Sequence, residues 1–334
     1  MSKERDYWFD NAKFIMIVAV ILGHCIDKLG EGPLSNDVNA LMYFFRMPVF
    51  IFISGYFSRK MDWSRFLKFV IGILESYLII SVFLIIYEMG VGNSFSLGLF
   101  IKPRWTLWYL LSLIFWRLAI QLLSGVISPF ALVVLSFVLG VASGFVPFGA
   151  VLSLQRSFTF APFFMIGFYC RQNNIDLHKV KRIHPLTSLA VLGIILFCVS
   201  RTDFPVVDFV RGKYPFSYFK NYSLWLLPLY RIGMYLVSMI SIISVMALIP
   251  EKQSWISREG ENTLFYYLYH SLVILALFTL GRFSLPSSLV ACLIYAAFVT
   301  VVIWGLIKIP FFKVLPKLFT HVISAKNNKP VNIA

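Results

Sequence analysis

The sequence predicts an all-α polytopic membrane protein, a bundle of about ten transmembrane helices. Hydrophobic residues make up 59% of the 334 residues and charged residues only 13%, whereas about 25% of the residues in soluble domains are charged. Apolar runs of about 20 residues, the length of a membrane-spanning helix, recur along the chain. These runs are continuous and do not alternate with polar residues, which favours helices over a membrane β-barrel.

The spans follow one another from near the N-terminus. The first apolar run is expected to stay in the protein, because it is too long for a signal peptide and has no small-residue cleavage site. The predicted spans cover residues 12–29, 39–58, 66–88, 105–124, 127–146, 157–171, 186–200, 223–249, 262–281 and 286–310. We expect one membrane domain over 1–320 and a short cytoplasmic tail at 321–334. No internal repeat is visible, which disfavours transporter folds built from two related halves.

Positive charge predicts the orientation of the bundle. If the N-terminus is cytoplasmic, the inside segments carry about twice as many lysines and arginines as the outside loops. This bias predicts cytoplasmic N- and C-termini. The net charge of +15 is explained by the same bias and by attraction to anionic membrane lipids, so no nucleic-acid partner is expected. The four cysteines have no metal-like spacing, and no metal site is predicted.

The first span, "DNAKFIMIVAVILGHC", carries ionisable groups that are costly in lipid. Lys13 and His24 are eleven residues apart, which places them on one helix face, roughly 16 Å apart along the axis, with Asp10 near the same face. Alone, Lys13 could snorkel to the interface and His24 could make an interhelical hydrogen bond. Together they suit a substrate that threads the bilayer, with Lys13 holding a phosphate-bearing donor and His24 taking a proton.

The next two spans contain further candidates. Arg46 stays charged and must face water, a carboxylate or a phosphate. Pro48 and the small pair Ser54-Gly55 allow a bend and a close helix contact in the same span. Glu75 lies near the middle of its span. It has two interpretations: a structural ion pair with an intramembrane arginine (Arg46, Arg117 or Arg231), or a catalytic role such as orienting His24.

Aromatic and basic residues mark the remaining spans. An aromatic belt at the outer interface explains Trp105, Trp108 and Tyr109. Arg156 lies at the outer edge of a Pro-containing aromatic helix, in "RSFTFAPFFMIGFY". In "GENTLFYYLYHSLVI", His270 lies about two turns inside the membrane, where a buried interhelical hydrogen bond is one interpretation and a substrate contact is the other.

These motifs resemble the acyltransferase 3 family of integral membrane O-acyltransferases, particularly the branch related to fucose 4-O-acetylases. The resemblance covers nearly the whole chain. It rests on Asp10 followed by Lys13-x10-His24 and on four further motifs in order: "RMPVFIFISGYF" (46–57), "LWYL" (107–110), "FAPFFMIGFY" (160–169) and "NTLFYYLYH" (262–270). Related sequences often read F-H-M-P-L-F where this chain has Phe45-Arg46-Met47-Pro48, so Arg46 cannot act as a base at that position.

The resemblance implies transfer of an acyl group, commonly acetyl from cytoplasmic acetyl-CoA, to a carbohydrate hydroxyl of a surface or exported glycan. The expected location is the cell (inner or plasma) membrane, and the expected partners are membrane lipids and a glycan or lipid-linked saccharide acceptor. Another acyl donor, such as succinyl-CoA, stays open. The alternatives from other classes are a lipid-linked sugar flippase or transporter, which would do no covalent chemistry, and a glycan polymerase, which would have longer polar outer loops.

On this hypothesis, His24 is the catalytic general base, or forms a transient acyl-histidine, and Glu75 assists it. Lys13 and Asp10 belong to the donor site. Five residues would hold the acceptor or stabilise developing negative charge: Arg46, Tyr109, Arg117, Arg156 and His270.

Overall fold

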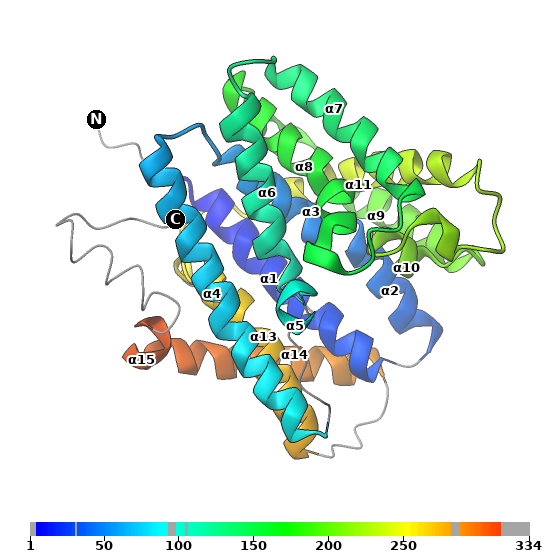
Figure 1. The fold of residues 1–334 in the computed structure, drawn as a ribbon. Coiled ribbons are helices and arrows are strands. Elements are labelled where there is room, and N and C mark those ends of the chain that lie inside the picture. Colours follow the sequence, from blue (N-terminus) through cyan, green and yellow to red (C-terminus); the bar gives the residue numbers. More distant parts are fainter. Residues whose placement is uncertain (1–4, 31, 93–97, 104–105, 282–287, 315–334) are drawn as a thin grey trace.

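The computed structural model describes residues 5–30, 32–92, 98–103, 106–281 and 288–314, and in these ranges it contains helices and no strand (Figure 1). The predicted tail at 321–334 and Trp105 lie outside the described residues. The helices are α1 (Tyr7–Leu29), α2 (Pro33–Tyr43), α3 (Arg46–Tyr56), α4 (Trp63–Gly90), α5 (Gly98–Ile101), α6 (Trp108–Leu123), α7 (Pro129–Ala142), α8 (Leu154–Gln172), α9 (Pro185–Ser200), α10 (Val206–Val210), α11 (Leu227–Leu248), α12 (Trp255–Gly260), α13 (Thr263–Gly281), α14 (Leu289–Lys308) and α15 (Pro310–Val314).

Five helical segments are long and apolar enough to cross a membrane: Pro33–Tyr56, Trp63–Gly90, Val151–Gln172, Leu227–Leu248 and Leu289–Lys308. Shorter apolar helices occupy Trp108–Leu123, Pro129–Phe145, Pro185–Ser200 and Thr263–Thr279. The chain is therefore an all-α membrane protein, as the composition predicts. The count of ten spans and the cytoplasmic orientation of both termini stay predictions.

The helix α1 lies in the middle of the bundle and contacts α2, α3, α12, α13 and α14 (Figure 1). Its N-terminus is capped by Asp6, whose side chain accepts a hydrogen bond from the backbone N–H of Trp8. This is the usual way to satisfy the first free N–H groups of a helix. No break interrupts α1 between its first and last residues, so Lys13 and His24 lie on one continuous helix as predicted.

The predicted span 39–58 is not one continuous helix. It is divided into α2 and α3 at Phe44–Phe45, where Phe45 leaves helical geometry with φ −128° and ψ −36°. Pro48 favours this break: it has no N–H to donate to the carbonyl four residues earlier, that of Phe44, so the helical hydrogen-bond pattern is interrupted there. Pro48 then lies in the first turn of α3, where its missing N–H costs least. The break places Arg46 at the start of α3.

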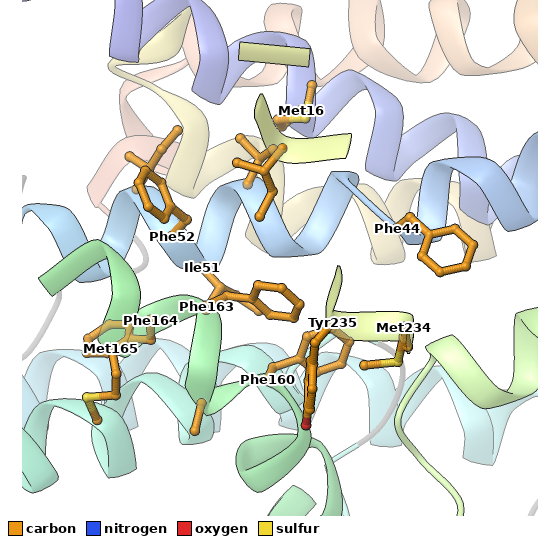
Figure 2. Close-up of a cluster of buried hydrophobic side chains, with 14 of the residues drawn as sticks. Met16, Phe44, Ile51, Phe52, Phe160, Phe163, Phe164, Met165, Met234 and Tyr235 are labelled. Atoms are coloured by element: carbon orange, nitrogen blue, oxygen red, sulfur yellow. The ribbon is translucent and has the colours of Figure 1, made fainter. Parts of the chain in front are cut away.

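Two glycines let α3 and α8 pack with their backbones in contact. A Cβ atom on Gly55 would overlap the carbonyl oxygen of Phe164, and one on Gly167 would overlap the carbonyl oxygen of Phe52. The predicted close helix contact at Ser54-Gly55 is therefore confirmed, with α8 as the partner. Around it, apolar side chains of α1, α3, α8 and α11 form a continuous core (Figure 2).

Polar contacts tie the N-terminal end of α1 to distant segments. The Trp8 indole donates to the carbonyl of Met246 at 3.1 Å, and Asn11 donates to the carbonyl of Pro250 at 2.7 Å. The ring of His178 hydrogen-bonds Asp6 at 2.9 Å and Glu251 at 2.7 Å. These contacts connect the start of α1 with His178 and residues 246–251 at one end of the bundle. The charge bias predicts that this end is cytoplasmic.

Replacing Gly167 by alanine should destabilise the protein by about 1–3 kcal/mol, because the added methyl must push α3 and α8 apart. Gly193→Ala in α9 and Gly233→Ala in α11 are matched controls: a Cβ at either position meets no atom within 4 Å. The controls should be neutral or slightly stabilising. Thermal unfolding of the protein in detergent measures the difference, and equal midpoints for Gly167→Ala and the controls would contradict the packing argument.

The contacts of His178 also predict a pH dependence. Burial lowers the pKa of His178, but its hydrogen bonds with Glu251 and Asp6 outweigh burial, and the pKa is raised above its ordinary value. Because the folded-state pKa is the higher one, this stabilisation is complete below the ordinary pKa and is lost as pH rises through the raised value. The effect should be small, since the side chain is 44% exposed.

The measurement is the thermal midpoint of wild type and of His178→Gln in detergent between about pH 6 and about pH 9, the range in which a histidine with a raised pKa titrates. Wild type should lose its advantage over the variant as pH rises. The control is Gln253→Ala, which changes an exposed side chain without a titratable group, so its difference from wild type should not change with pH. A constant gap between wild type and His178→Gln would refute the assigned role.

Candidate active site

A small cavity lies beside the second half of α1, where the break between α2 and α3, the start of α8 and the segment after α10 meet. Its volume is about 50 Å³. It is lined by Val20, His24, Tyr43, Arg46, Met47, Thr106, Trp108, Arg156, Phe160, Arg211 and Tyr267. The sequence analysis selected three of these residues as site residues: His24, Arg46 and Arg156.

The imidazole of His24 is held between a carboxylate and a second imidazole. Its Nδ1 lies 3.8 Å from Oδ2 of Asp27, one helical turn further along α1. Its ring stacks on the ring of His270 with centroids 5.4 Å apart. The side chain of His24 is 20% exposed. It therefore stays accessible from the cavity although Asp27 and His270 restrict its rotation. A histidine with a neighbouring carboxylate and partial access is suited to proton transfer.

Asp27 joins three segments of the chain. Its carboxylate accepts hydrogen bonds from Asn39 at 2.8 Å and Tyr43 at 3.1 Å, both on α2. It also forms an ion pair with Arg211 at 2.5 Å, and Arg211 in turn donates to the Tyr43 hydroxyl at 2.7 Å. The sequence analysis missed Asp27. The available signal was its spacing, because His24-x-x-Asp27 places both side chains on one face of a helix.

Arg46 projects from the first turn of α3 towards α1 and is only 2% exposed. It donates to the side-chain oxygen of Asn39 at 3.1 Å, and its guanidinium lies 3.7 Å from the ring centre of Tyr43. It passes directly over Gly23, where any Cβ atom would overlap the guanidinium. Any side chain at position 23 would displace the guanidinium of Arg46 from this position.

Arg156 lies on the first turn of α8. Its guanidinium is 5.1 Å from the Trp108 ring centre, a cation–π contact. Its Nε is buried and has no hydrogen-bond partner among the described residues. Trp108, predicted as part of an outer aromatic belt, is buried and lines the cavity instead.

The helix α13 contributes the inner wall. His270 Nδ1 is 3.0 Å from the carbonyl oxygen of Tyr266. Since a carbonyl only accepts, Nδ1 carries the proton and Nε2 keeps its lone pair in the neutral ring. Nε2 is buried without a partner among the described residues. Beside it, the Tyr267 hydroxyl donates to the carbonyl of Thr106. His270 therefore packs against the ring of His24 from the side of α13.

A model of the acyltransferase 3 family, described as an acyltransferase domain, matches residues 6–307. The chain belongs to this family. It is therefore a membrane acyltransferase that uses an acyl donor, and the transporter alternative is not favoured. The match does not distinguish the fucose 4-O-acetylase-related branch, which stays a prediction. No curated protein and no solved structure matches the chain.

Six of the nine predicted site residues of the acyltransferase lie outside the cavity lining. They are His270, the two donor residues Lys13 and Asp10, and three more: Tyr109, Arg117 and Glu75. Tyr109 is adjacent: its ring is 5.4 Å from that of Tyr267, and its hydroxyl is 2.5 Å from that of Ser54. Arg117 lies two turns further along α6, with its guanidinium 4.6 Å from the Phe69 ring centre. Glu75 is buried in α4 and is not among the lining residues.

The predicted donor residues lie at the other end of α1. Lys13 Nζ is 2.8 Å from one carboxylate oxygen of Asp10, and Arg5 is 2.7 Å from the other. Arg5 also pairs with Glu261 at 2.7 Å. In the described part of the acyltransferase, no group of three or more His, Cys, Asp or Glu side chains is placed to hold a metal ion.

Replacing Asp27 by asparagine should destabilise the acyltransferase by about 1–3 kcal/mol, because the partly buried Arg211 would lose its nearest carboxylate and the charge on its hydrogen-bond acceptor. Asp37→Asn, in the neighbouring helix α2, is the control: Asp37 makes no hydrogen bond or ion pair with the residues that the structure describes. Thermal midpoints in detergent measure both variants. If they unfold at the same temperature, the Asp27 contacts do not hold the site together.

Proposed function

We propose that this acyltransferase moves an acetyl group from cytoplasmic acetyl-CoA to a carbohydrate hydroxyl of a surface or exported glycan, with His24 as the general base. The observation that carries the proposal is the placement of His24, which faces a cavity with Asp27 on one side and the His270 ring on the other. In a family of acyltransferases, a supported histidine in a largely buried cavity has the chemistry that the reaction needs.

The reaction requires one proton to be moved twice. His24 takes the proton of the sugar hydroxyl as its oxygen attacks the thioester carbonyl carbon. The tetrahedral intermediate then collapses, the carbon–sulfur bond breaks, and the proton on His24 passes to the CoA sulfur. Asp27, whose Oδ2 lies 3.8 Å from Nδ1 of His24, would offset part of the positive charge on the ring between the two steps. The products are the acetyl ester and free CoA.

A second route is open to the same residue. His24 could attack the thioester itself, form an acyl-histidine and release CoA before the sugar hydroxyl takes the acyl group. Both routes need the ring to be deprotonated when the reaction starts. The contact with His270 supports either, since stacking fixes the plane of the attacking ring.

The donor site is proposed at the N-terminal end of α1. Lys13 lies about 16 Å along the helix from His24, from eleven residues at 1.5 Å each. A CoA phosphate at Lys13 would leave the flexible arm to carry the thioester inward to His24. Asp10, paired with Lys13 at 2.8 Å, holds the ammonium in position. Other acyl-CoA donors, such as succinyl-CoA, use the same contacts.

The acceptor is proposed to bind from the other end of the bundle, with Arg46, Arg156, Tyr109 and His270 as contacts or supports. Arg117 and Glu75 lie outside the cavity lining, and for them the proposed roles remain a contact with the acceptor and assistance to His24, respectively. Binding requires movement, because about 50 Å³ is far below the roughly 300–1,000 Å³ of small-molecule pockets. We propose that one membrane domain, residues 1–320, carries both the donor and the acceptor site. Its proposed location is the cell (inner or plasma) membrane.

The experiment measures alkali-labile acetate on surface glycan from strains with the gene intact, deleted, or carrying His24→Ala or His24→Gln at matched membrane abundance. We expect both His24 variants to lose acetate to the level of the deletion, since loss of a general base costs about 10²–10⁴-fold in rate. His184→Ala, which changes an exposed histidine outside the cavity, should keep normal acetate.

Each other result has a clear meaning. Acetate unchanged in the deletion strain, with glycan still exported, would exclude acetyl transfer to that glycan as the function. Acetate lost in the deletion strain but kept in both His24 variants would retain the reaction and remove His24 as its base.

A further inference from the structure

The cavity beside His24 has an unbalanced charge. Three arginines line it, Arg46, Arg156 and Arg211, and no carboxylate does among the described residues. Arginine stays protonated at any physiological pH. The cavity wall therefore carries three positive charges, and Asp27, which contacts Arg211 from outside the lining, neutralises only one of them.

The contacts of the arginines show which charges are left. Arg211 has two carboxylate neighbours, Asp27 at 2.5 Å and Asp208 at 3.5 Å. Arg46 has a neutral amide and an aromatic ring as its partners. Arg156 has the Trp108 ring, and its buried Nε has no hydrogen-bond partner in the described part of the chain. Arg46, which is buried, and Arg156, which is partly buried, are thus cations without a carboxylate partner there.

Such an arrangement is costly unless an anion completes it. Ring faces and a neutral amide offset part of the desolvation of a guanidinium, but a buried charge without a counter-charge loses several kcal/mol. Guanidinium groups recognise carboxylate and phosphate groups in a planar, two-point geometry. The cavity is therefore suited to a ligand that carries one of these groups.

The position of the arginines separates them from the donor site. Arg211 pairs with Asp27, which follows Lys13 by fourteen residues on one continuous helix, about 21 Å along the axis. Arg156 lies on the first turn of α8, whereas the last turn of α8 lies near Lys60 and the end of α6. The three arginines are thus at the end of the bundle opposite to Lys13, on the acceptor side of His24.

We propose that the acceptor is an anionic saccharide, which carries a carboxylate or phosphate next to the hydroxyl that is acylated, and that Arg156 and Arg46 bind this anion. This inference rests on the proposed function, and it specifies the class of acceptor. The anion lies between the two arginines, and the adjacent hydroxyl then faces His24. Arg211, already paired with Asp27, closes the cavity over the bound sugar.

The first test is binding without any acyl transfer. Purified protein in detergent is heated with methyl glycosides of the gluco, galacto and manno series, each as the neutral sugar, the uronate and the 6-phosphate. An anionic member of at least one series should raise the unfolding temperature of wild type more than its neutral counterpart does. Arg156→Gln should reduce that difference, since only Arg46 of the two anion-binding arginines remains, whereas Arg201→Gln, which removes an exposed charge outside the cavity, should keep it.

The binding results decide the proposal and the anion. A larger effect of the uronates indicates a carboxylate, and a larger effect of the 6-phosphates indicates a phosphate. Equal shifts for neutral and anionic sugars, no shift with any anion, or an unchanged shift in Arg156→Gln would overturn the proposal. So would a result in which Arg156→Gln loses stabilisation by CoA but not by the sugars, because the arginine would then serve the donor.

The second test separates substrate binding from transition-state stabilisation. With acetyl-CoA as donor, kcat/KM for the preferred anionic glycoside should exceed that for the neutral one by about ten- to a hundredfold, the usual effect of one charge-assisted hydrogen bond. Arg156→Gln should reduce this ratio towards one through KM. An equal loss of kcat on both acceptors would instead assign Arg156 to the oxyanion and contradict acceptor selection.

The two hypotheses fail in different ways. If the glycan-acetate experiment fails while anionic glycosides still bind through Arg156, the proposed reaction is wrong and the anion site stands. If acetate transfer depends on His24 but neutral and anionic sugars behave alike, the reaction stands and the acceptor class is wrong.

Discussion

The carboxylate of Asp27 holds together the half of the molecule that contains the cavity. It joins α1 to α2 through Asn39 and Tyr43, and it joins both to the segment after α10 through Arg211. These contacts lie one turn from His24 on the same helix. In a protein interior of low dielectric constant, a charge that is shared in this way fixes its partners more strongly than neutral hydrogen bonds would. The geometry around His24 thus depends on a residue that does not line the cavity.

Backbone constraints bring the second set of groups to this point. Since backbone groups in lipid must be satisfied within the protein, a helix can be interrupted only where other elements surround it. The interruption before Pro48 is enclosed in this way, and it turns Arg46 towards α1. Further along, Gly55 of α3 and Gly167 of α8 let the backbones of the two helices come into contact. That contact fixes the position of α8, and its first turn carries Arg156 to the same cavity.

Much of the helical architecture was predictable, because apolar length is a strong signal in a membrane protein. The shared face of Lys13 and His24 was also predictable, since both lie on one helix and the period is regular. A bend in the second span was predictable from Pro48, but the division into two helices at Phe44–Phe45 was not, because the bounds of the span were drawn by hydropathy alone. The roles of Asp27 and Arg211 depend on contacts between segments about 180 residues apart. The spacing of residues within one helix cannot predict such contacts.

The small volume of the cavity has a consequence for the cell's energy supply. Under the proposed chemistry, one histidine receives its donor from one side of the membrane and its acceptor from the other. If both sides were open at once, a chain of water molecules through His24 could carry protons down the membrane gradient. A space of about 50 Å³ holds only a few ordered water molecules, since each needs roughly 10–15 Å³ of such space. Under the proposed chemistry, the walls around His24 must therefore separate the two sides of the membrane between turnovers, so that the membrane stays insulating.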